Sequence, residues 1–244
     1  MNQIATTSFP PSYTLQVNAR AKYPRLKMVP HKGLVVVIPV GFSKKHIPDL
    51  LKQHEEWIRK IEHHFEAHRQ TAEEAFEVLP TTITFSTFNE AWQLNYHQAA
   101  RNSVRLTMQG EGQLLLSGNI GETALCRQVL TKWLNRRADV LLSPRLTQLA
   151  ASVGMCFSTT TMRCQQSRWG SCSSKGAITL NSKLLFLPEE LVRHVMLHEL
   201  CHTLHMNHSA AFWAEVARFD PQWKHHKREM KDAWKFVPRW LTAL

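Results

Sequence analysis

The sequence predicts an α+β protein, and three observations support this class. Hydrophobic residues make up 43% of the 244 residues and charged residues 20%, which is the composition of globular domains. Apolar and polar residues alternate in several short runs before residue 121, a pattern typical of strands. From residue 122 onward, apolar residues recur at helical spacing over long stretches. The length allows one or two domains.

The N-terminal part is predicted to contain a tail, two strands and one long helix. Residues 1–12 are polar, include two prolines and read as a flexible tail. Alternation predicts strands over 13–19 and 33–39, joined by a basic loop over 20–27. Ser43 is a suitable N-cap for a helix that reaches about Thr71.

A β-meander is predicted to follow, and it completes an N-terminal region over residues 13–121. Its four short strands are expected at 81–85, 91–96, 104–108 and 113–117. A second region over 122–244 then begins with a helix at 122–153. Later elements are a strand pair at 156–163 and 177–180, a helix that starts at Pro188, and helices at 209–219 and 222–236.

Charge and cysteine content narrow the classes of function. The net charge of +11 and the pI of about 9.7 favour polyanionic partners. The best nucleic-acid candidate is the basic face of helix 122–153, although a solvated face is the simpler explanation. Its cations are Lys132, Arg136, Arg137 and Arg145. The five cysteines form no C-x-x-C pair, so neither a zinc ribbon nor a disulfide framework is indicated.

Membrane insertion and secretion are not predicted. No apolar run approaches the roughly 20 residues that a membrane span needs. The N-terminus has neither the basic nor the apolar region of a signal peptide, so a cytoplasmic location is the default expectation.

The motif His198-Glu199-Leu-Cys-His202 is the main chemical signal in the chain. On a helix, residues four apart lie one above the other, so His198 and His202 can bind one metal ion. Glu199 then lies beside the metal, where it can take a proton from a water molecule.

A third ligand is expected at His208, six residues after His202. Requiring this extra histidine lowers the rate of accidental matches to about three per thousand chains. His205 would lie about 10 Å along a straight helix from His198, so the chain must turn first, and Asn207 tolerates the left-handed conformation of such a turn. Glu215 and Asp220 are alternative third ligands.

Three protein ligands leave the fourth position of a metal open, which is the catalytic arrangement. Neutral imidazoles suit Zn²⁺, and Ni²⁺ or Co²⁺ would also fit. The expected reaction is hydrolysis of an amide or peptide bond, with Glu199 as general base and a protein or peptide as substrate.

Several segments together resemble the YgjP-like metallopeptidase family, a family of metal-dependent hydrolases related to the SprT-like zincins. They are Arg168-Trp-Gly-Ser-Cys-Ser173, Ile178–Asn181, the motif at 198–202, Asn207–Ser209 and Phe212-Trp213, with further likeness in the N-terminal strand and helix. The resemblance covers nearly the whole chain. It implies a minimal zincin core in 122–244, in which a helix and a small sheet support the metal-binding helix. It also implies that His198, Glu199, His202 and His208 are site residues.

Two further residues have both a functional and a structural interpretation; the two are balanced for Arg168, and the structural one is favoured for His194. Arg168 could stabilise an oxyanion as a catalytic residue, or it could pair with a carboxylate at a strand end. His194, one helical turn before His198, could be a shuttle or a buried structural histidine.

Two other functions remain open from the sequence alone. One is a zinc amidohydrolase that acts on a small molecule. The other is a nucleic-acid-associated protein whose zinc site is structural or regulatory.

Overall fold

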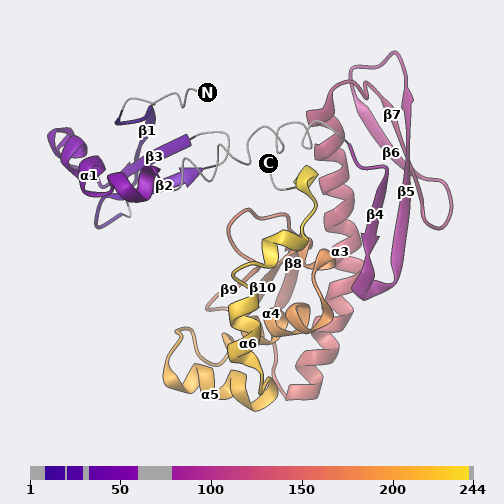
Figure 1. Cartoon of the computed structure of the whole chain (residues 1–244). Coiled ribbons are helices and arrows are strands. Elements are labelled where there is room, and N and C mark those ends of the chain that lie inside the picture. The colour runs from indigo at the N-terminus through magenta and orange to yellow at the C-terminus, as the bar shows by residue number, and fades with distance from the viewer. Residues whose placement is uncertain (1–8, 20, 30–32, 60–78, 242–244) are drawn as a thin grey trace, which may run out of the picture. The chain divides into compact units, whose positions relative to one another are not determined.

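The computed structural model describes residues 9–19, 21–29, 33–59 and 79–241, which fall into two compact units (Figure 1). The first unit includes residues 9–59 and the second includes 79–241. The boundary expected at 121/122 therefore lies inside the second unit. The reason is that the helix after this boundary packs against elements from both sides of it and shares one hydrophobic core with them.

The first unit is a three-stranded sheet with helical turns. β1 (Tyr13–Val17) pairs in parallel with the central β3 (Gly33–Ile38), and β2 (Arg25–Val29) pairs antiparallel with the other side of β3. The basic run expected to be a loop thus ends in an edge strand, because its apolar Leu26 packs against the core.

The helix expected over 43–71 is interrupted in the described residues. A 3₁₀ turn at Lys44–His46 follows Ser43, α1 includes Ile47–Gln53, and a turn at His54 separates α1 from a further helical stretch over 55–59. The expected helix residues 60–71 lie outside the described residues, as do residues 1–8 of the expected tail. Ile47, Leu51 and Ile58 pack against β3 and form the core of this unit.

The second unit begins with a four-stranded sheet of order β4-β5-β7-β6. Its strands are β4 (Thr82–Phe85), β5 (Glu90–Gln98), β6 (Val104–Met108) and β7 (Gln113–Gly118). The predicted strands are present, but the predicted meander is wrong, because β7 lies between β5 and β6 and pairs in parallel with β5. β7 is an inner strand and β6 an edge strand, because Leu114 and Leu116 of β7 are fully buried, whereas β6 has no buried residue.

The long helix α3 (Thr123–Val153) links this sheet to the rest of the unit. Apolar residues about four positions apart, from Cys126 to Ala150, form its buried face. It ends at Gly154, which adopts the left-handed conformation with φ of 70°. α3 contacts β6 on one side and β8 and α4 on the other, and Figure 1 shows it between the two groups of elements.

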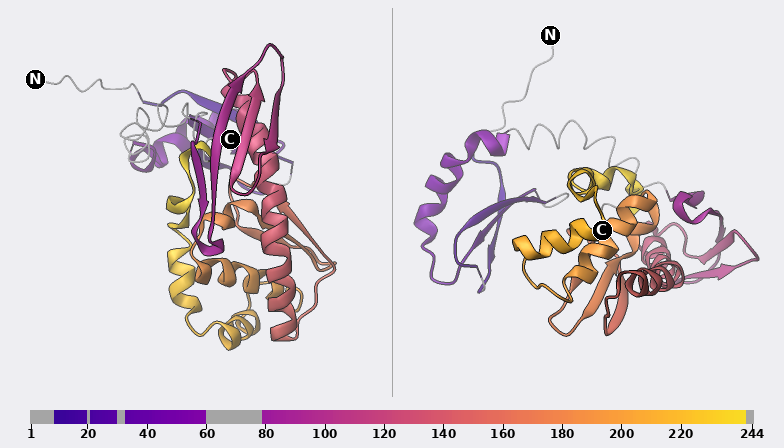
Figure 2. Two further views of the ribbon diagram at one scale, coloured as in Figure 1. Left: turned by 90° about the vertical axis from the view of Figure 1, so that its right-hand side faces the viewer. Right: turned by 90° about the horizontal axis from the view of Figure 1, so that it is seen from below.

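The remaining elements form the part of the fold that carries the sequence motif. β8 (Thr159–Arg163), β10 (Ala177–Asn181) and β9 (Gly170–Cys172) form a sheet of order β8-β10-β9. Helices α4 (Glu189–Cys201), α5 (Ala210–Phe219) and α6 (Trp223–Glu229) follow, and 3₁₀ turns lie at Ser182–Phe186, Ala233–Phe236 and Arg239–Leu241. α4 packs against β9 and β10, and α5 and α6 pack against α4; Figure 2 shows this part of the chain, in orange and yellow, from two further sides.

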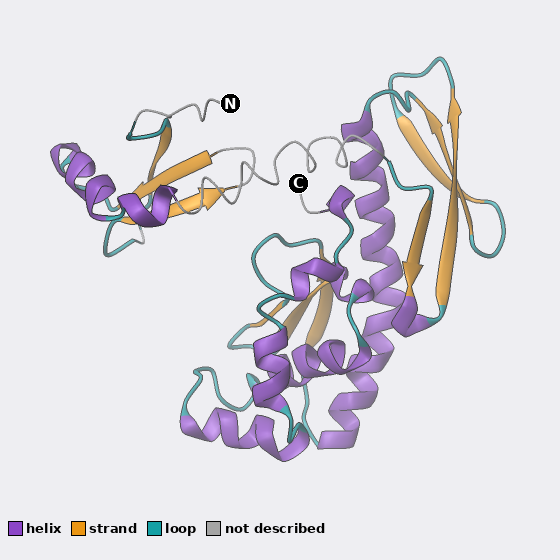
Figure 3. Cartoon of the chain, in the orientation of Figure 1, coloured by secondary structure: helices purple, strands orange, loops and turns teal. Residues whose placement is uncertain are grey.

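Helices and sheets occupy separate layers, as the secondary-structure colouring shows (Figure 3). The predicted α+β class is therefore confirmed. None of the helices within the described residues combines the length and apolar character that a bilayer crossing requires.

The basic face predicted on α3 carries less free charge than the sequence suggests. Arg137 forms a two-pronged ion pair with Glu90 and lies over the ring of Trp92. Arg145 pairs with Glu189 at the start of α4. Two of the four cations on this face are thus partly neutralised by carboxylates that are distant in the sequence.

Candidate metal centre

Helix α4 places the first two histidines of the motif on one face. Pro188 precedes the helix, and Glu189 and Glu190 in its first turn suit the positive end of the helix dipole. The ring centroids of His198 and His202 are 4.8 Å apart. The spacing of four residues therefore brings both rings to one place, as the sequence predicts.

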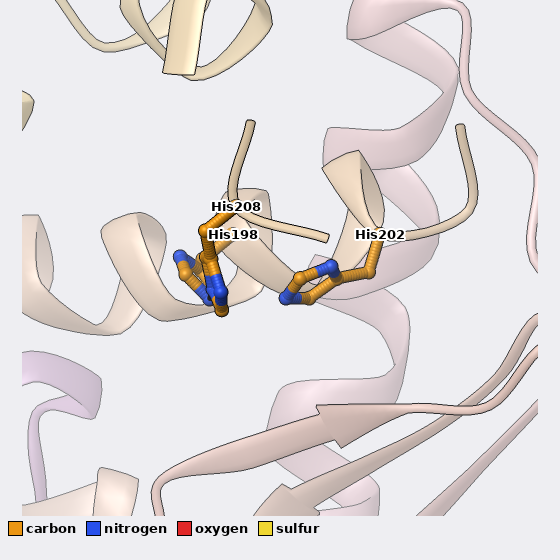
Figure 4. Close-up of side chains that lie close together, drawn as sticks. All are labelled: His198, His202 and His208. Carbon is orange, nitrogen blue, oxygen red and sulfur yellow. Dashed lines mark hydrogen bonds between the residues drawn. The ribbon is translucent and has the colours of Figure 1, made fainter. Parts of the chain in front are cut away.

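His208 reaches the same place from the segment after the helix (Figure 4). Its ring centroid lies 5.0 Å from that of His198 and 4.8 Å from that of His202. One ligating atom of each histidine lies within 4.8 Å of the others, and the Nε2 atoms of His198 and His208 are 3.0 Å apart. Convergence of three imidazole nitrogens is a geometry that suits zinc.

The turn that brings His208 back differs from the one expected. α4 ends at Cys201, and hydrogen bonds from the amides of Thr203, Leu204 and His205 to Leu200 and Cys201 tighten the chain there. Asn207 does not adopt the left-handed conformation; among the described non-glycine residues only Asn89 does. A tightened helix end reverses the chain here without a residue at positive φ.

Side chains and backbone around the three histidines fix their orientation. The Nδ1 atom of His202 lies 3.0 Å from the carbonyl oxygen of His205, so Nδ1–H donates there and leaves Nε2 for a metal. Phe212 is fully buried and contacts all three imidazole rings. Ser209 caps α5 by accepting a hydrogen bond from the Phe212 amide, which holds this ring under the site.

Neither alternative third ligand joins this group. Glu215 pairs with Arg218 one turn along α5. Asp220 binds His194 and His226 instead. His208 is the residue that the structure brings to His198 and His202.

Glu199 lies beside the histidines with only 5% of its surface exposed. Its Oε2 atom is sealed from solvent and has no hydrogen-bond partner among the described residues. Burial raises the pKa of this carboxyl to about 8, against the opposing charge of Arg168. A buried carboxylate oxygen without a partner is costly, and a catalytic role with a water as partner is one explanation for it.

Gly170 on β9 makes room for Glu199. A Cβ atom on Gly170 would lie 2.6 Å from Oε1, 2.7 Å from Cγ and 2.8 Å from Cδ of Glu199. The backbone of β9 therefore approaches the glutamate as closely as only glycine allows. The sequence alone does not identify this contact between the strand and Glu199.

Arg168 and Asn181 shape the loop before β9. The Arg168 side chain is exposed and forms no ion pair with any residue in the described ranges, and its charge lowers the pKa of Glu199. The buried Asn181 donates to the carbonyl oxygens of Gln165 and Arg168 and accepts from the Lys183 amide. Asn181 thus orders the loop.

A cleft of about 550 Å³ lies beside the candidate metal ligands. His198, Glu199 and His208 lie at its polar side, and Trp169 and Trp213 form aromatic walls. Trp169 stacks on Trp234 with ring centroids 4.2 Å apart, which fixes one wall. Burial lowers the pKa of His198 to about 3, together with the charges of the neighbouring histidines and Lys227. The ring is therefore neutral and can offer a nitrogen lone pair to a metal. The cleft combines a set of metal donors with room for a substrate.

This arrangement defines a class of protein, the metal-dependent hydrolases with two histidines and a glutamate on one helix. The family model of the YgjP-like metallopeptidase domain matches residues 22–233, which is most of the chain. The chain therefore belongs to the YgjP-like metallopeptidase family, and it is a metal-dependent hydrolase.

Two solved structures are similar to part of the chain. The metallopeptidase zymogen abylysin of Pyrococcus abyssi is 27% identical, with a TM-score of 0.35, and the match covers 38% of this chain and 94% of that one. The metallopeptidase zymogen jannalysin of Methanocaldococcus jannaschii is 18% identical, with a TM-score of 0.34, and its match covers 37% and 94%. None of the curated proteins compared with the chain matches it significantly.

Removal of one histidine ring should empty the site. We expect zinc-loaded wild type, purified without a metal-affinity tag, to contain roughly one zinc per chain, and His202→Ala to contain almost none. His205→Ala is the matched control, because His205 contributes its backbone carbonyl and alanine keeps it. Elemental analysis checks both. Equal zinc in wild type and His202→Ala would contradict the ligand assignment.

Proposed function

We propose that the chain is a zinc peptidase, in which His198, His202 and His208 hold the metal and Glu199 is the general base. The observation that carries this proposal is the unpartnered, buried Oε2 of Glu199 next to three converging imidazoles. The residues fit zinc because they are three neutral nitrogen donors with an open cleft in front of them. Zinc in this position would lower the pKa of a water and polarise the substrate carbonyl.

Glu199 would take the proton of the attacking water and pass it to the leaving amine. Its burial supports this role, because a raised pKa brings the carboxyl close to neutral pH, where proton transfer in both directions is efficient.

An extended peptide fits the open edge of β9. The carbonyl of Trp169 accepts from the Asn181 amide, and the Ser173 amide donates to Ala177, so these residues face β10. In an antiparallel ladder, the N–H and C=O groups of successive residues point to alternate sides of the strand. Those of Gly170 and Cys172 therefore point away from β10, toward the edge of β9 that pairs with no strand in the described residues. A substrate strand added there would pass directly in front of Glu199. This geometry favours a peptide over a small amide.

Peptide cleavage tests the function. We expect the zinc-loaded full chain to cleave some members of a library of internally quenched peptides, to lose activity with a chelator and to regain it with zinc. His202→Ala should remain inactive after zinc is added. If no peptide is cleaved while small amides are hydrolysed, the amidohydrolase alternative holds instead.

Arg168 is proposed to stabilise the oxyanion. Its positive charge acts on Glu199 by opposing the rise of the carboxyl pKa, and no carboxylate in the described part of the chain pairs with it. We expect Arg168→Met to lower kcat by about tenfold with zinc retained, which is less than loss of a buried oxyanion donor because this side chain is exposed. Arg163→Met, at an exposed position on β8, is the control. Unchanged kcat in Arg168→Met would assign Arg168 to the loop structure alone.

A further inference from the structure

Three side chains outside the proposed metal-binding set form a hydrogen-bonded cluster beside it. His194 lies on α4 one turn before His198, Asp220 follows α5, and His226 lies on α6. The Oδ2 atom of Asp220 lies 2.7 Å from Nδ1 of His194 and 2.9 Å from Nδ1 of His226. The side chains of His194 and Asp220 are 5% exposed and that of His226 is 12% exposed. Histidines from α4 and α6 thus meet at one oxygen atom of the carboxylate that follows α5.

The bonds within the cluster fix the state of the His194 ring. Burial alone would raise the pKa of Asp220, but the hydrogen bonds from His226 and His194 outweigh it and keep this pKa below its usual value. The Nδ1 atom of His194 faces this carboxylate at 2.7 Å, and burial lowers the pKa of the ring, which favours its neutral form. A carboxylate only accepts hydrogen bonds, so the ring proton of His194 lies on Nδ1. Its Nε2 atom then carries a lone pair and acts as an acceptor.

The Nε2 atom of His194 opens into the cleft. It makes no hydrogen bond to any described residue, and it is not sealed from solvent. His194 lines the same cavity as His198 and Glu199, and its ring centroid lies 6.4 Å from that of His198. A buried carboxylate therefore holds one acceptor atom toward the space in front of the metal ligands.

A peptide in this cleft needs such an acceptor. Successive main-chain N–H groups of an extended peptide point to opposite edges. Those that face β9 find its outward carbonyl groups, but those that face α4 lose water and require a different partner. His194 is the α4 side chain that offers an acceptor to the cleft without serving as a proposed metal ligand or general base.

We propose that His194 is a further catalytic residue, whose Nε2 accepts a hydrogen bond from a main-chain N–H of the bound peptide. Asp220 and His226 are positioning residues that hold the His194 ring and its tautomer. The inference rests on the proposed peptidase function. It adds a substrate contact on α4 to the pairing proposed with β9.

The test uses the zinc-loaded full chain with two probes. One is a peptide hydroxamate, whose hydroxamate group binds zinc and whose main-chain N–H groups occupy the cleft. The other is acetohydroxamate, which has no peptide chain. We expect His194→Phe, which keeps a ring but has no acceptor atom, to weaken the peptide hydroxamate about three- to tenfold in a titration calorimeter, the effect of one lost hydrogen bond, and to leave acetohydroxamate unchanged. Zinc content and Tm verify that the variant is folded.

A spectroscopic measurement on the wild type avoids dependence on the folding of a variant. In protein labelled with ¹⁵N-histidine, His194 should show a protonated Nδ1 and an unprotonated Nε2, and the peptide hydroxamate should shift the Nε2 resonance. His226→Gln should change the tautomer signal of His194 and weaken the peptide probe. His225→Gln is the matched control, because His225 is the exposed neighbour that faces Glu229.

Three outcomes would overturn the inference, and they are distinguishable. Equal affinity of wild type and His194→Phe for the peptide hydroxamate, with no shift of Nε2, removes His194 from the substrate site and leaves the peptidase proposal intact. Two zinc ions per chain, with the second lost in His226→Gln, would make the cluster a metal site. Binding of acetohydroxamate without binding of any peptide hydroxamate would overturn the peptidase proposal and this inference with it.

Discussion

Glu199→Gln is expected to keep its zinc and its fold and to lose nearly all hydrolytic activity. Glutamine has the same shape but cannot accept the proton of water, so kcat should fall by about 10²–10⁴-fold, the usual contribution of general acid–base catalysis. Zinc should stay near the wild-type amount, because the three histidines rather than Glu199 converge as donors. Peptide cleavage, zinc content and Tm, measured on one preparation, check the three parts of this expectation.

The same substitution separates an enzyme from a structural zinc protein. In a structural site the variant would behave as wild type, whereas removal of zinc by a chelator would unfold the chain. The buried Oε2 of Glu199 has no described partner, so the amide of glutamine breaks no existing bond there. The Tm of Glu199→Gln should therefore be equal to or above that of wild type. A large drop in Tm with activity retained would refute the assignment of Glu199 as general base.

Gly170→Ala should strongly reduce activity although it changes no proposed metal ligand. The added methyl group would lie 2.6–2.8 Å from three atoms of Glu199, well inside van der Waals contact. The carboxyl must move, or β9 must, and a displacement of about 1 Å at a catalytic group costs on the order of 10²-fold in rate. We expect this loss in kcat with zinc content unchanged, measured with the same peptide substrates.

The control for this prediction is Gly121→Ala. Gly121 is the other described glycine that does not lie at positive φ, and its nearest contact would be 3.7 Å away, at Asn119. Its substitution should leave both activity and zinc unchanged. If Gly170→Ala retained full activity, then the close approach of β9 to Glu199 would not constrain catalysis, and the proposed substrate path along β9 would lose its main support.

Local patterns explain which parts of the structure the sequence predicts. The helical spacing of apolar residues identifies α3 and α4 within a few residues, and the spacing of four between His198 and His202 places both rings on one face. These features depend only on the geometry of a single helix. The strands of the first sheet of the second unit were located for the same reason, since alternation is a local property.

Long-range packing explains what the sequence does not predict. The place of β7 between β5 and β6 depends on which strand buries more apolar surface, and local alternation does not reveal this. The contact of Gly170 with Glu199 joins a strand to a helix 29 positions later in the chain. Asp220 could be recognised as an acidic side chain near the site, but its bonds to His194 and His226 depend on how α5 and α6 fold back on α4.

The proposed ligands occupy a short stretch of chain, and this has a consequence for the supply of metal. His198, His202 and His208 lie within one helix end and the segment that follows it, whereas the hydrophobic core of this unit extends from Ile83 to Leu241. Bringing such near neighbours together costs little loop-closure entropy, so the pocket is largely preformed before any ion arrives. For the proposed zinc site, we therefore expect the metal-free protein to stay folded and to gain activity as zinc is added.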